Sequence, residues 1–327
     1  MSKLKLTLAC WDYDRTRPLI DGRVQAEGVD LEVKVLRPRE TFPRMLERQE
    51  FEVSELSLGS YVSLKGRGAC PFVAMPVALS KIFRHSCIYV RTDANIRTPR
   101  DLRGKRVGTT QLGSTASIFM NGMLQHEYGV TMEDIHWFIG GLTTPTQRPL
   151  IPLQLPENIK VEFLPSNQTL EGMLENGDLD ALLAIFLPSM FQEGSPRIAR
   201  LFTNYYDIER DYYRRTGIFP IMHTVVLRGD IYREHPWAAR SIYRAFCAAR
   251  DLAIDGLYDT DALRLSLPWL IHHVEETWRV LGKDFWAYGL EPNRPALEAI
   301  GQYVYEQHFS PRVVSPDELF ASNVEYD

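Results

Sequence analysis

An arginine, which can bind an anion, and a histidine, which can transfer a proton, are neighbours in the sequence just before the apolar run 87–90. A short apolar run between polar residues is typical of a buried strand. Arginine binds a carboxylate through two parallel hydrogen bonds, and histidine titrates near neutral pH. We predict that Arg84 holds an anionic group and that His85 is a candidate acid. The alternatives are a structural ion pair for Arg84 and a buried structural role for His85.

Neighbouring residues of a strand point to opposite faces, so Arg84 and His85 can face one ligand only if the chain bends at 83–86. Without such a bend, we expect Arg84 to be the ligand residue. His223, which precedes the apolar run 224–227, is then the better candidate acid.

Further candidates follow or interrupt the first and third expected strands. Asp12 and Arg15 come directly after the run 4–10, where Asp12 could orient a histidine and Arg15 could bind a carboxylate. The alternative for Asp12 is a turn residue bonded to its own backbone. Glu55 lies between apolar neighbours within 51–58 and either faces solvent or needs a partner, for which Arg84 is a candidate.

Two more anion-binding candidates belong to the middle of the chain. Ser114 and Thr115 follow Gly113 at the expected start of a helix, where free backbone N–H groups favour an anion. The alternative there is an ordinary helix N-cap. Arg148 lies in the long, Pro- and Gly-rich stretch 140–158, and either closes over a ligand or is a solvated loop charge.

The elements that must position these residues alternate between strands and helices. Strands are expected at 4–10, 29–36, 51–58 and 72–77, with short helices between them, and a similar order recurs after residue 99. This order predicts an α/β fold of two lobes, each a mainly parallel sheet flanked by helices. Ligands of such sheets bind at the carboxyl ends of strands, which places the ligand in a cleft between the lobes. We expect one lobe to comprise 1–93 and 187–327, and the other to comprise 94–186.

Composition excludes several classes of function. The 327 residues carry a formal net charge of −5 and no long basic run, which disfavours nucleic acid as a partner. No apolar stretch approaches the length of a membrane span, so no membrane partner is expected. The apolar part of the N-terminus is too short for a signal peptide, from which we expect a cytoplasmic location. A homo-oligomer is left open.

The metal-ligand pattern is weak. None of the four cysteines forms a CxxC pair, and the adjacent His272 and His273 point about 100° apart on a helix. We therefore predict no metal site and no cofactor, while a divalent metal stays open.

Several segments together resemble the 4,5-dihydroxyphthalate decarboxylase family, within the type II periplasmic-binding-protein-like fold. The segment 101–108, DLRGKRVG, is common to lobes of this fold and says nothing about chemistry. More specific are the segments 11–15, 83–86 and 140–142, and the stretch around Arg148 and 153–156. The resemblance spans nearly the whole chain.

The resemblance implies a carboxy-lyase that converts 4,5-dihydroxyphthalate to 3,4-dihydroxybenzoate and CO2, a step of phthalate degradation. A ring hydroxyl para to the departing carboxylate would supply electrons while an acid protonates the ring carbon. Arg84, Arg15 and the 113–115 turn would hold carboxylates. His85 or His223 would be the acid, with Asp12 nearby.

Two other functions fit the same residues. The fold also serves solute-binding and sensing proteins, so a non-catalytic binder of an anionic aromatic is one alternative. A related enzyme acting on another aromatic acid is the other.

Overall fold

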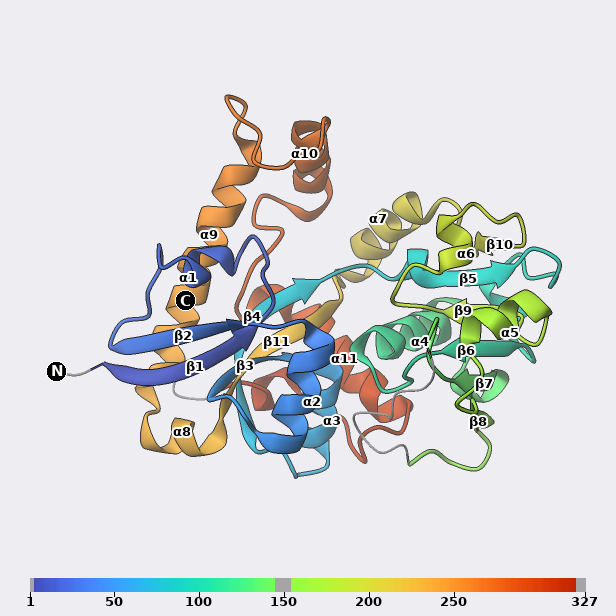
Figure 1. Ribbon diagram of the computed structural model, residues 1–327, viewed down its shortest axis with the longest axis horizontal. Coiled ribbons are helices and arrows are strands. Elements are labelled where there is room, and N and C mark those ends of the chain that lie inside the picture. The colour runs from blue at the N-terminus through green and yellow to red at the C-terminus, as the bar shows by residue number, and fades with distance from the viewer. Residues whose placement is uncertain (1–2, 145–153, 322–327) are drawn as a thin grey trace.

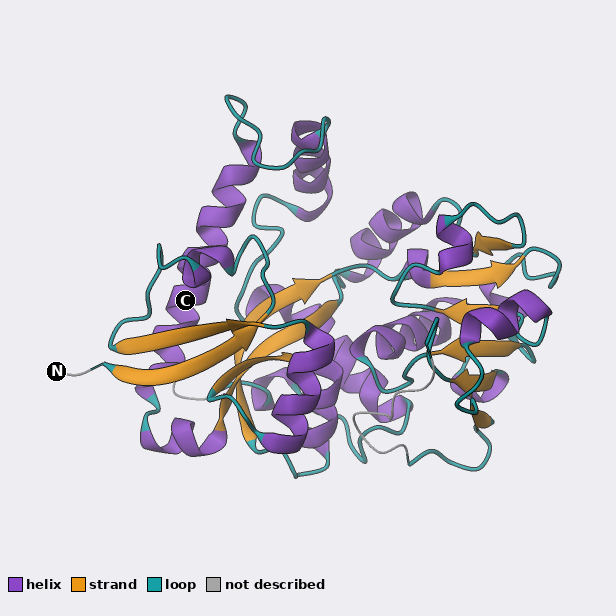
Figure 2. Cartoon of the chain, in the orientation of Figure 1, coloured by secondary structure: helices purple, strands orange, loops and turns teal. Residues whose placement is uncertain are grey.

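The computed structural model describes residues 3–144 and 154–321. Its β-strands form two sheets that lie in separate lobes, with helices around each (Figures 1 and 2). Most elements follow the sequence patterns, because the apolar side chains of most strands and helices are buried against the neighbouring layer.

The first sheet has the strand order β2-β1-β3-β11-β4 within the described part of the chain. Its strands are β1 (Leu4–Cys10), β2 (Val29–Val35), β3 (Val53–Ser57), β4 (Phe72–Lys81) and β11 (Ile221–Arg228). β1 pairs parallel with β2 and β3, whereas β11 is antiparallel to both β3 and β4. The return strand β11 therefore lies inside this sheet, beside β3.

The second sheet has the order β10-β5-β9-β6-β7-β8 among the described residues. Its strands are β5 (Ile88–Arg91), β6 (Arg106–Thr109), β7 (His136–Ile139), β8 (Val161–Phe163), β9 (Ala181–Leu183) and β10 (Ile198–Arg200). β6, β7, β8 and β9 run parallel, and β5 is antiparallel to both β9 and β10.

Helices cover both sheets (Figure 2). Those along the first lobe are α1 (Arg17–Ile20), α2 (Pro38–Arg48), α3 (Leu58–Gly66), α8 (Gly229–Glu234), α9 (Trp237–Asp255), α10 (Leu270–Leu281) and α11 (Arg294–Glu306). Those along the second are α4 (Thr115–Tyr128), α5 (Leu170–Asn176), α6 (Ser189–Gln192) and α7 (Tyr205–Thr216). A 3-10 turn, η1 (His85–Cys87), leads from β4 into β5.

The predicted α/β architecture of two helix-flanked sheets is confirmed, with two differences. Both sheets are mixed, because β11 and β5 each run against their neighbours. The expected division at 93/94 and 186/187 also assigns β5 and β10 to the first lobe. The structure places both in the second sheet, since β5 pairs with β9 and β10, so the chain changes sheets between β4 and β5.

The lobes touch where α4 approaches α3 and α11 (Figure 1). The Thr115 hydroxyl at the start of α4 lies 2.8 Å from the Ser57 hydroxyl at the end of β3, and it accepts the Gly59 N–H at 2.9 Å. Deeper along α4, Gly122 packs against the Tyr303 ring of α11. The two lobes are thus joined by direct packing as well as by the crossing chains.

No helix within residues 3–144 and 154–321 is long and apolar enough to cross a membrane. The cytoplasmic location stays a prediction.

Candidate functional site

The centre of the candidate site is Glu55, a carboxylate on β3 whose side chain is fully buried. Its Oε1 accepts hydrogen bonds from the Tyr13 hydroxyl and from Nδ1 of His223, both at 2.7 Å. Its Oε2 accepts the backbone N–H of Trp11 at 2.9 Å. A buried charge is stabilised only when such donors surround it, so these contacts explain how strand β3 tolerates a glutamate.

Strand pairing brings these residues together from distant parts of the chain. On β11, His223 pairs with Ser57 and Val225 pairs with Glu55, so Glu55 and His223 are diagonal neighbours on β3 and β11. The pairing of β11 with β4 shifts register on both sides of His223. Bulges of this kind redirect side chains and are frequent beside active sites.

The electrostatics keep Glu55 ionised. Burial raises the pKa of its carboxyl, but the hydrogen bond and charge of His223 and the hydrogen bonds from Tyr13 and Trp11 outweigh burial, so the pKa lies below its ordinary value. A carboxylate can only accept, so Nδ1 of His223 carries the proton in this bond. The other ring nitrogen, Nε2, makes no hydrogen bond to any described residue, and 19% of the His223 side chain is exposed. His223 therefore has one nitrogen fixed and one available to a ligand.

Tyr13 and Arg15 complete this cluster on the segment after β1. Burial and the Glu55 charge raise the pKa of Tyr13 far above its ordinary value, so Tyr13 stays a neutral donor. The Arg15 guanidinium lies 4.2 Å from the centre of the Tyr13 ring and 4.4 Å from that of Trp286. It also donates from Nε to the Leu79 carbonyl at 2.6 Å and pairs with Asp14 at 2.9 Å. Arg15 is thus held rigidly beside Tyr13.

Asp12 is in the same segment but does not bond to His223 in the structure. One of its oxygens, Oδ2, pairs with Arg17. The other, Oδ1, is buried and has no hydrogen-bond partner among the described residues. A buried acceptor without a donor is costly, and a ligand hydroxyl would satisfy it.

Arg84 is a half-buried cation beside β11. Its guanidinium contacts two sulfur atoms, Sδ of Met222 at 3.3 Å and Sγ of Cys87 at 3.7 Å. No carboxylate within the described residues forms an ion pair with it, which removes the predicted alternative of a structural ion pair for that part of the chain. Glu55, its other expected partner, bonds to His223 and Tyr13 instead. A partly buried arginine that contacts only sulfur retains donors for an anion.

His85 lies in a different environment. The chain does bend at η1, as the prediction for a shared site required, but only 2% of His85 is exposed. Its ring packs edge-on against Phe202 and Tyr212, and neither ring nitrogen has a hydrogen-bond partner among the described residues. Burial, followed by the charge of Arg215, lowers the pKa of His85 to about 4. The ring is therefore neutral at physiological pH, which disfavours a role as an acid.

The turn at Ser114 and Thr115 is occupied by the protein itself. The Ser114 hydroxyl accepts the Ser117 N–H at 3.2 Å and so caps α4, which is the alternative that the sequence left open. The Thr115 hydroxyl is taken by Ser57 and Gly59 across the two lobes. These contacts occupy the two hydroxyls of the turn, and the predicted carboxylate role stays a prediction.

Two other predictions have no further support. Arg148 lies outside the described residues. Within residues 3–144 and 154–321, no group of three or more His, Cys, Asp or Glu side chains could hold a metal ion. The absence of a metal or cofactor stays a prediction.

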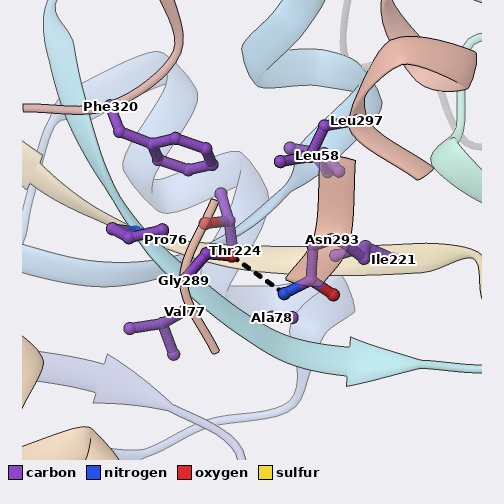
Figure 3. A pocket seen from close by; sticks show the side chains of 10 residues that line it. All are labelled: Leu58, Pro76, Val77, Ala78, Ile221, Thr224, Gly289, Asn293, Leu297 and Phe320. Carbon is purple, nitrogen blue, oxygen red and sulfur yellow. Dashed lines mark hydrogen bonds between the residues drawn. The ribbon is translucent and has the colours of Figure 1, made fainter. Parts of the chain in front are cut away.

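A small pocket lies between β4, β11 and α11, and no residue of the Glu55 cluster is in its lining (Figure 3). Its lining is mostly apolar and includes Leu58, Ala78, Leu297 and Phe320. The Asn293 amide, its most polar group, donates to the Gly289 carbonyl at 2.9 Å. It has neither a cation nor an acid in its lining, so we do not consider it the site.

Sequence reasoning named Glu55, His223, Arg15 and Asp12, and the first three lie in one cluster. It missed Tyr13, which contacts Glu55 directly. The available signal was position alone, since Tyr13 follows β1 at the carboxyl end where ligands of such sheets bind.

The chain is similar to known proteins in sequence and in fold. A family model described as "ABC transporter, phosphonate, periplasmic substrate-binding protein" matches residues 13–144. The 4,5-dihydroxyphthalate decarboxylase of Comamonas testosteroni is 37% identical over 320 residues, which cover 98% of this chain and 97% of the relative. The protein of the same name from Pseudomonas putida is 37% identical over 214 residues, 65% of this chain and 83% of the relative.

Solved structures show the fold. The periplasmic aliphatic sulphonate binding protein SsuA from Escherichia coli matches with a TM-score of 0.53 at 14% identity, covering 99% of both chains. The alkanesulfonate-binding protein SsuA from Xanthomonas axonopodis pv. citri, bound to MOPS, matches with a TM-score of 0.52 at 14% identity, again over 99% of both chains. The predicted periplasmic-binding-protein-like fold is therefore confirmed. The 37% identity to the Comamonas protein, over nearly the full length of both chains, further shows that this chain belongs to the 4,5-dihydroxyphthalate decarboxylase family.

Proposed function

We propose that this protein is a carboxy-lyase that converts 4,5-dihydroxyphthalate to 3,4-dihydroxybenzoate and CO2 without an organic cofactor. Family membership supports the substrate and the reaction. The single structural observation that supports the chemistry is the hydrogen bond between the buried Glu55 carboxylate and Nδ1 of His223. It leaves Nε2 of His223 free to give a proton.

The reaction needs a proton at the ring carbon that loses the carboxylate. In the proposal, protonated His223 donates from Nε2 to this carbon while the para hydroxyl donates electron density into the ring. The carbon–carbon bond to the carboxylate then breaks, and its electron pair restores the aromatic ring as CO2 leaves. One proton is consumed per turnover, and solvent restores it to His223. The Glu55 carboxylate stabilises the imidazolium before the transfer.

The substrate brings two carboxylates and two hydroxyls, and the nearby residues match them in charge. Arg84, which has no carboxylate partner among the described residues, would bind the retained carboxylate. Arg15 adds a second positive charge next to Tyr13. Asp12 Oδ1 would accept a hydrogen bond from a ring hydroxyl. A cleft between the lobes would enclose these groups.

Incubating the purified full-length chain with 4,5-dihydroxyphthalate tests the proposal. We expect release of CO2 together with an equal amount of 3,4-dihydroxybenzoate, at the same rate with and without a chelator. Binding without turnover would favour a solute-binding or sensing protein. Turnover of a different aromatic acid alone would favour the related enzyme, and loss of the rate with chelator would contradict cofactor independence.

A further inference from the structure

The Tyr13 hydroxyl is part of the candidate site but transfers no proton in the proposed reaction. It donates to Oε1 of Glu55 at 2.7 Å, and the same oxygen accepts the hydrogen bond from Nδ1 of His223 at 2.7 Å. The Tyr13 hydroxyl oxygen and Nδ1 of His223 are 3.4 Å apart. Two donors, one from the segment after β1 and one from β11, therefore share a single carboxylate oxygen of β3.

Several contacts fix the direction in which the Tyr13 hydroxyl points. The Tyr13 backbone N–H donates to the Thr16 hydroxyl at 2.8 Å, and the Arg15 guanidinium lies 4.2 Å from the centre of the Tyr13 ring. The Ser80 hydroxyl of β4 also hydrogen-bonds to the Tyr13 hydroxyl. Because the Glu55 carboxylate can only accept, the Tyr13 proton lies in the bond to Glu55, and Ser80 is the donor to the Tyr13 oxygen.

The hydrogen bond from Tyr13 changes how strongly Glu55 attracts the His223 proton. A hydrogen bond to a carboxylate stabilises its charged form and makes it a weaker base. The bond from Tyr13 therefore reduces the attraction that Glu55 exerts on the proton of the His223 imidazolium. With this bond in place, His223 releases its proton more readily than it would beside Glu55 alone.

We propose that Tyr13 is a positioning residue that acts through Glu55 and sets the pH at which His223 loses its proton. This inference rests on the proposed function, in which protonated His223 is the acid. The ring carbon takes up a proton faster from an acid that holds it less tightly, while the acid must still be protonated at physiological pH. Tyr13 serves both needs by weakening the effect of Glu55 without removing it, and it does so without touching the substrate.

Other charged and titratable groups surround the three residues, but within the described part of the chain none of them hydrogen-bonds to Glu55 or His223. They are Cys10 at the end of β1, Asp12, Asp14 and Arg15 after it, Lys81 on β4 and Arg84 beside β11. The Cys10 thiol stays neutral, because burial and the charges of Glu55 and Asp12 raise its pKa far above its ordinary value.

The helices around β11 place no charge against His223. Helix α2 faces it with the Phe42 ring, whose centre is 4.9 Å from that of the imidazole. Helices α3 and α4 also pack against β11, and their N-terminal parts, 58–62 and 115–124, carry no charged side chain. A change at the Tyr13 hydroxyl therefore acts on the His223 proton through Glu55.

Nuclear magnetic resonance titration of the histidine rings in the full-length chain tests the inference without any substrate. The His223 signal is the one that is absent from His223→Asn. Tyr13→Phe removes the hydroxyl and keeps the ring that Arg15 covers, and it should raise the pH midpoint of the His223 titration by about 0.4–1 pH unit. Fluorotyrosine in place of Tyr13 is a stronger donor and should lower the midpoint.

The matched control is Tyr258→Phe, which removes a tyrosine hydrogen bond to Glu275, of 2.6 Å, at the surface. It should leave the His223 midpoint unchanged, and circular dichroism shows that each variant is folded. A role of Tyr13 in stability alone would not move the midpoint in opposite directions for phenylalanine and fluorotyrosine. Equal midpoints in wild type and Tyr13→Phe would overturn the inference.

The pH profile of CO2 release connects this titration to the reaction. The rate should fall as pH rises and His223 loses its proton, and in Tyr13→Phe this fall should move to higher pH by the shift that the titration shows. KM should stay close to the wild-type value, since Tyr13 does not touch the substrate. A shifted titration in a chain that releases no CO2 would support the role of Tyr13 and contradict the proposed function.

Discussion

At the residue scale, the Glu55 side chain is fully buried and its two oxygens accept hydrogen bonds from three donors. Such a carboxylate is ionised, and its charge is available to the one donor that can become a cation, His223. Tyr13 cannot share this role, because its pKa is raised far above the physiological range. The geometry thus singles out His223 as the group whose proton Glu55 controls.

Glu55→Gln should lower kcat by about 100-fold, because the neutral amide cannot stabilise the imidazolium. KM should change little, since the buried Glu55 carboxylate contacts His223 and Tyr13 and does not contact the ligand. Steady-state kinetics with 4,5-dihydroxyphthalate measure both constants. Glu157→Gln, an exposed change in the second lobe, is the control and should leave kcat unaltered. A Glu55→Gln enzyme with the wild-type kcat would remove Glu55 from the mechanism.

Arg84→Ala should raise KM or abolish measurable binding, because the half-buried guanidinium is a free donor for a substrate carboxylate. A hydrogen-bonded charge of this kind contributes about 1.5–3 kcal/mol, a loss of about 10- to 150-fold in affinity. Isothermal titration with the substrate measures it. Arg97→Ala, an exposed change, should keep the wild-type affinity. Equal affinities for both variants would show that Arg84 holds no carboxylate.

Residue types in the sequence identified candidate site residues but could not show which of them contact one another. Glu55 and His223 are 168 positions apart, and their contact depends on the register of β3 with β11 and on the bulges beside His223. Arg84 was one candidate partner for Glu55, and the structure pairs Glu55 with His223 and Tyr13 instead. Strand register cannot be derived from one strand. Tyr13 was missed since a lone tyrosine in a loop carries no pattern.

At the scale of elements, the connection between the two sheets packs against helix α7. Glu209 of α7 accepts the backbone N–H of Ser86 at 3.4 Å and lies 3.7 Å from Nδ1 of His85. Burial raises the pKa of Glu209 to about 7, against the weaker effects of the backbone N–H groups of Ser86 and His85 and of the charges of two arginines, Arg200 and Arg84. A carboxyl that is half-protonated near neutrality therefore holds the segment where the chain changes lobes.

Glu209→Gln should change how stability depends on pH. In the native protein the folded state keeps the Glu209 proton between pH 4.5 and about 7, where the unfolded state has lost it. The free energy of unfolding therefore falls as pH rises through this window, by at most about 1.4 kcal/mol per pH unit. Glutamine does not titrate, so the Glu209→Gln protein does not lose this stability as pH rises.

Urea titrations at pH 5 and pH 8 measure the difference. The two proteins should be closest in stability at pH 5, and Glu209→Gln should be the more stable at pH 8. The titration of His85 is present in both chains and cancels to first order. A difference that does not grow between pH 5 and pH 8 would contradict the raised pKa.

Periodic elements were the ones that the sequence predicted well. β1, β2 and β3 were expected at 4–10, 29–36 and 51–58, close to their observed bounds, because each has an apolar pattern. β5 was assigned to the wrong sheet because an apolar run does not reveal which strand it pairs with.

At the scale of the whole molecule, the lobes are joined where α4 packs on α11 (Figure 1). A Cβ added to Gly122 would lie 2.2 Å from a ring carbon of Tyr303, well inside van der Waals contact. Only a residue without a side chain allows this approach. The relative position of the lobes therefore depends on a glycine in the middle of a helix.

Gly122→Ala should destabilise the protein by about 1–3 kcal/mol, because the Tyr303 ring or the whole of α11 must move. Alanine's better helix propensity offsets part of this cost, about 1 kcal/mol. Thermal and urea unfolding measure the change. Gly113→Ala is the control, since its added Cβ would stay 3.4 Å from the Phe309 ring. Equal stability of the two variants would show that the contact between α4 and α11 is easily relaxed.

The two-lobed architecture was predictable from the order of strands and helices, and the site was predictable only as a region. The points where the lobes meet, Gly122 with Tyr303 and Thr115 with Ser57, join residues far apart in the chain. No local pattern marks such contacts. For that reason the sequence alone left open whether Ser114 and Thr115 bind a ligand or cap a helix. The structure uses their hydroxyls to cap α4 and to join the lobes, and their role toward a ligand stays a prediction.

The most direct test of the proposed function compares wild type and His223→Asn in single-turnover decarboxylation of 4,5-dihydroxyphthalate. Asparagine can still donate a hydrogen bond to Glu55 but has no proton to give the ring, so the rate of CO2 release should fall by at least about 100-fold with substrate affinity retained. His126→Asn, a change at a histidine paired with Glu306, is the control. A His223→Asn enzyme that decarboxylates at the wild-type rate would contradict the account.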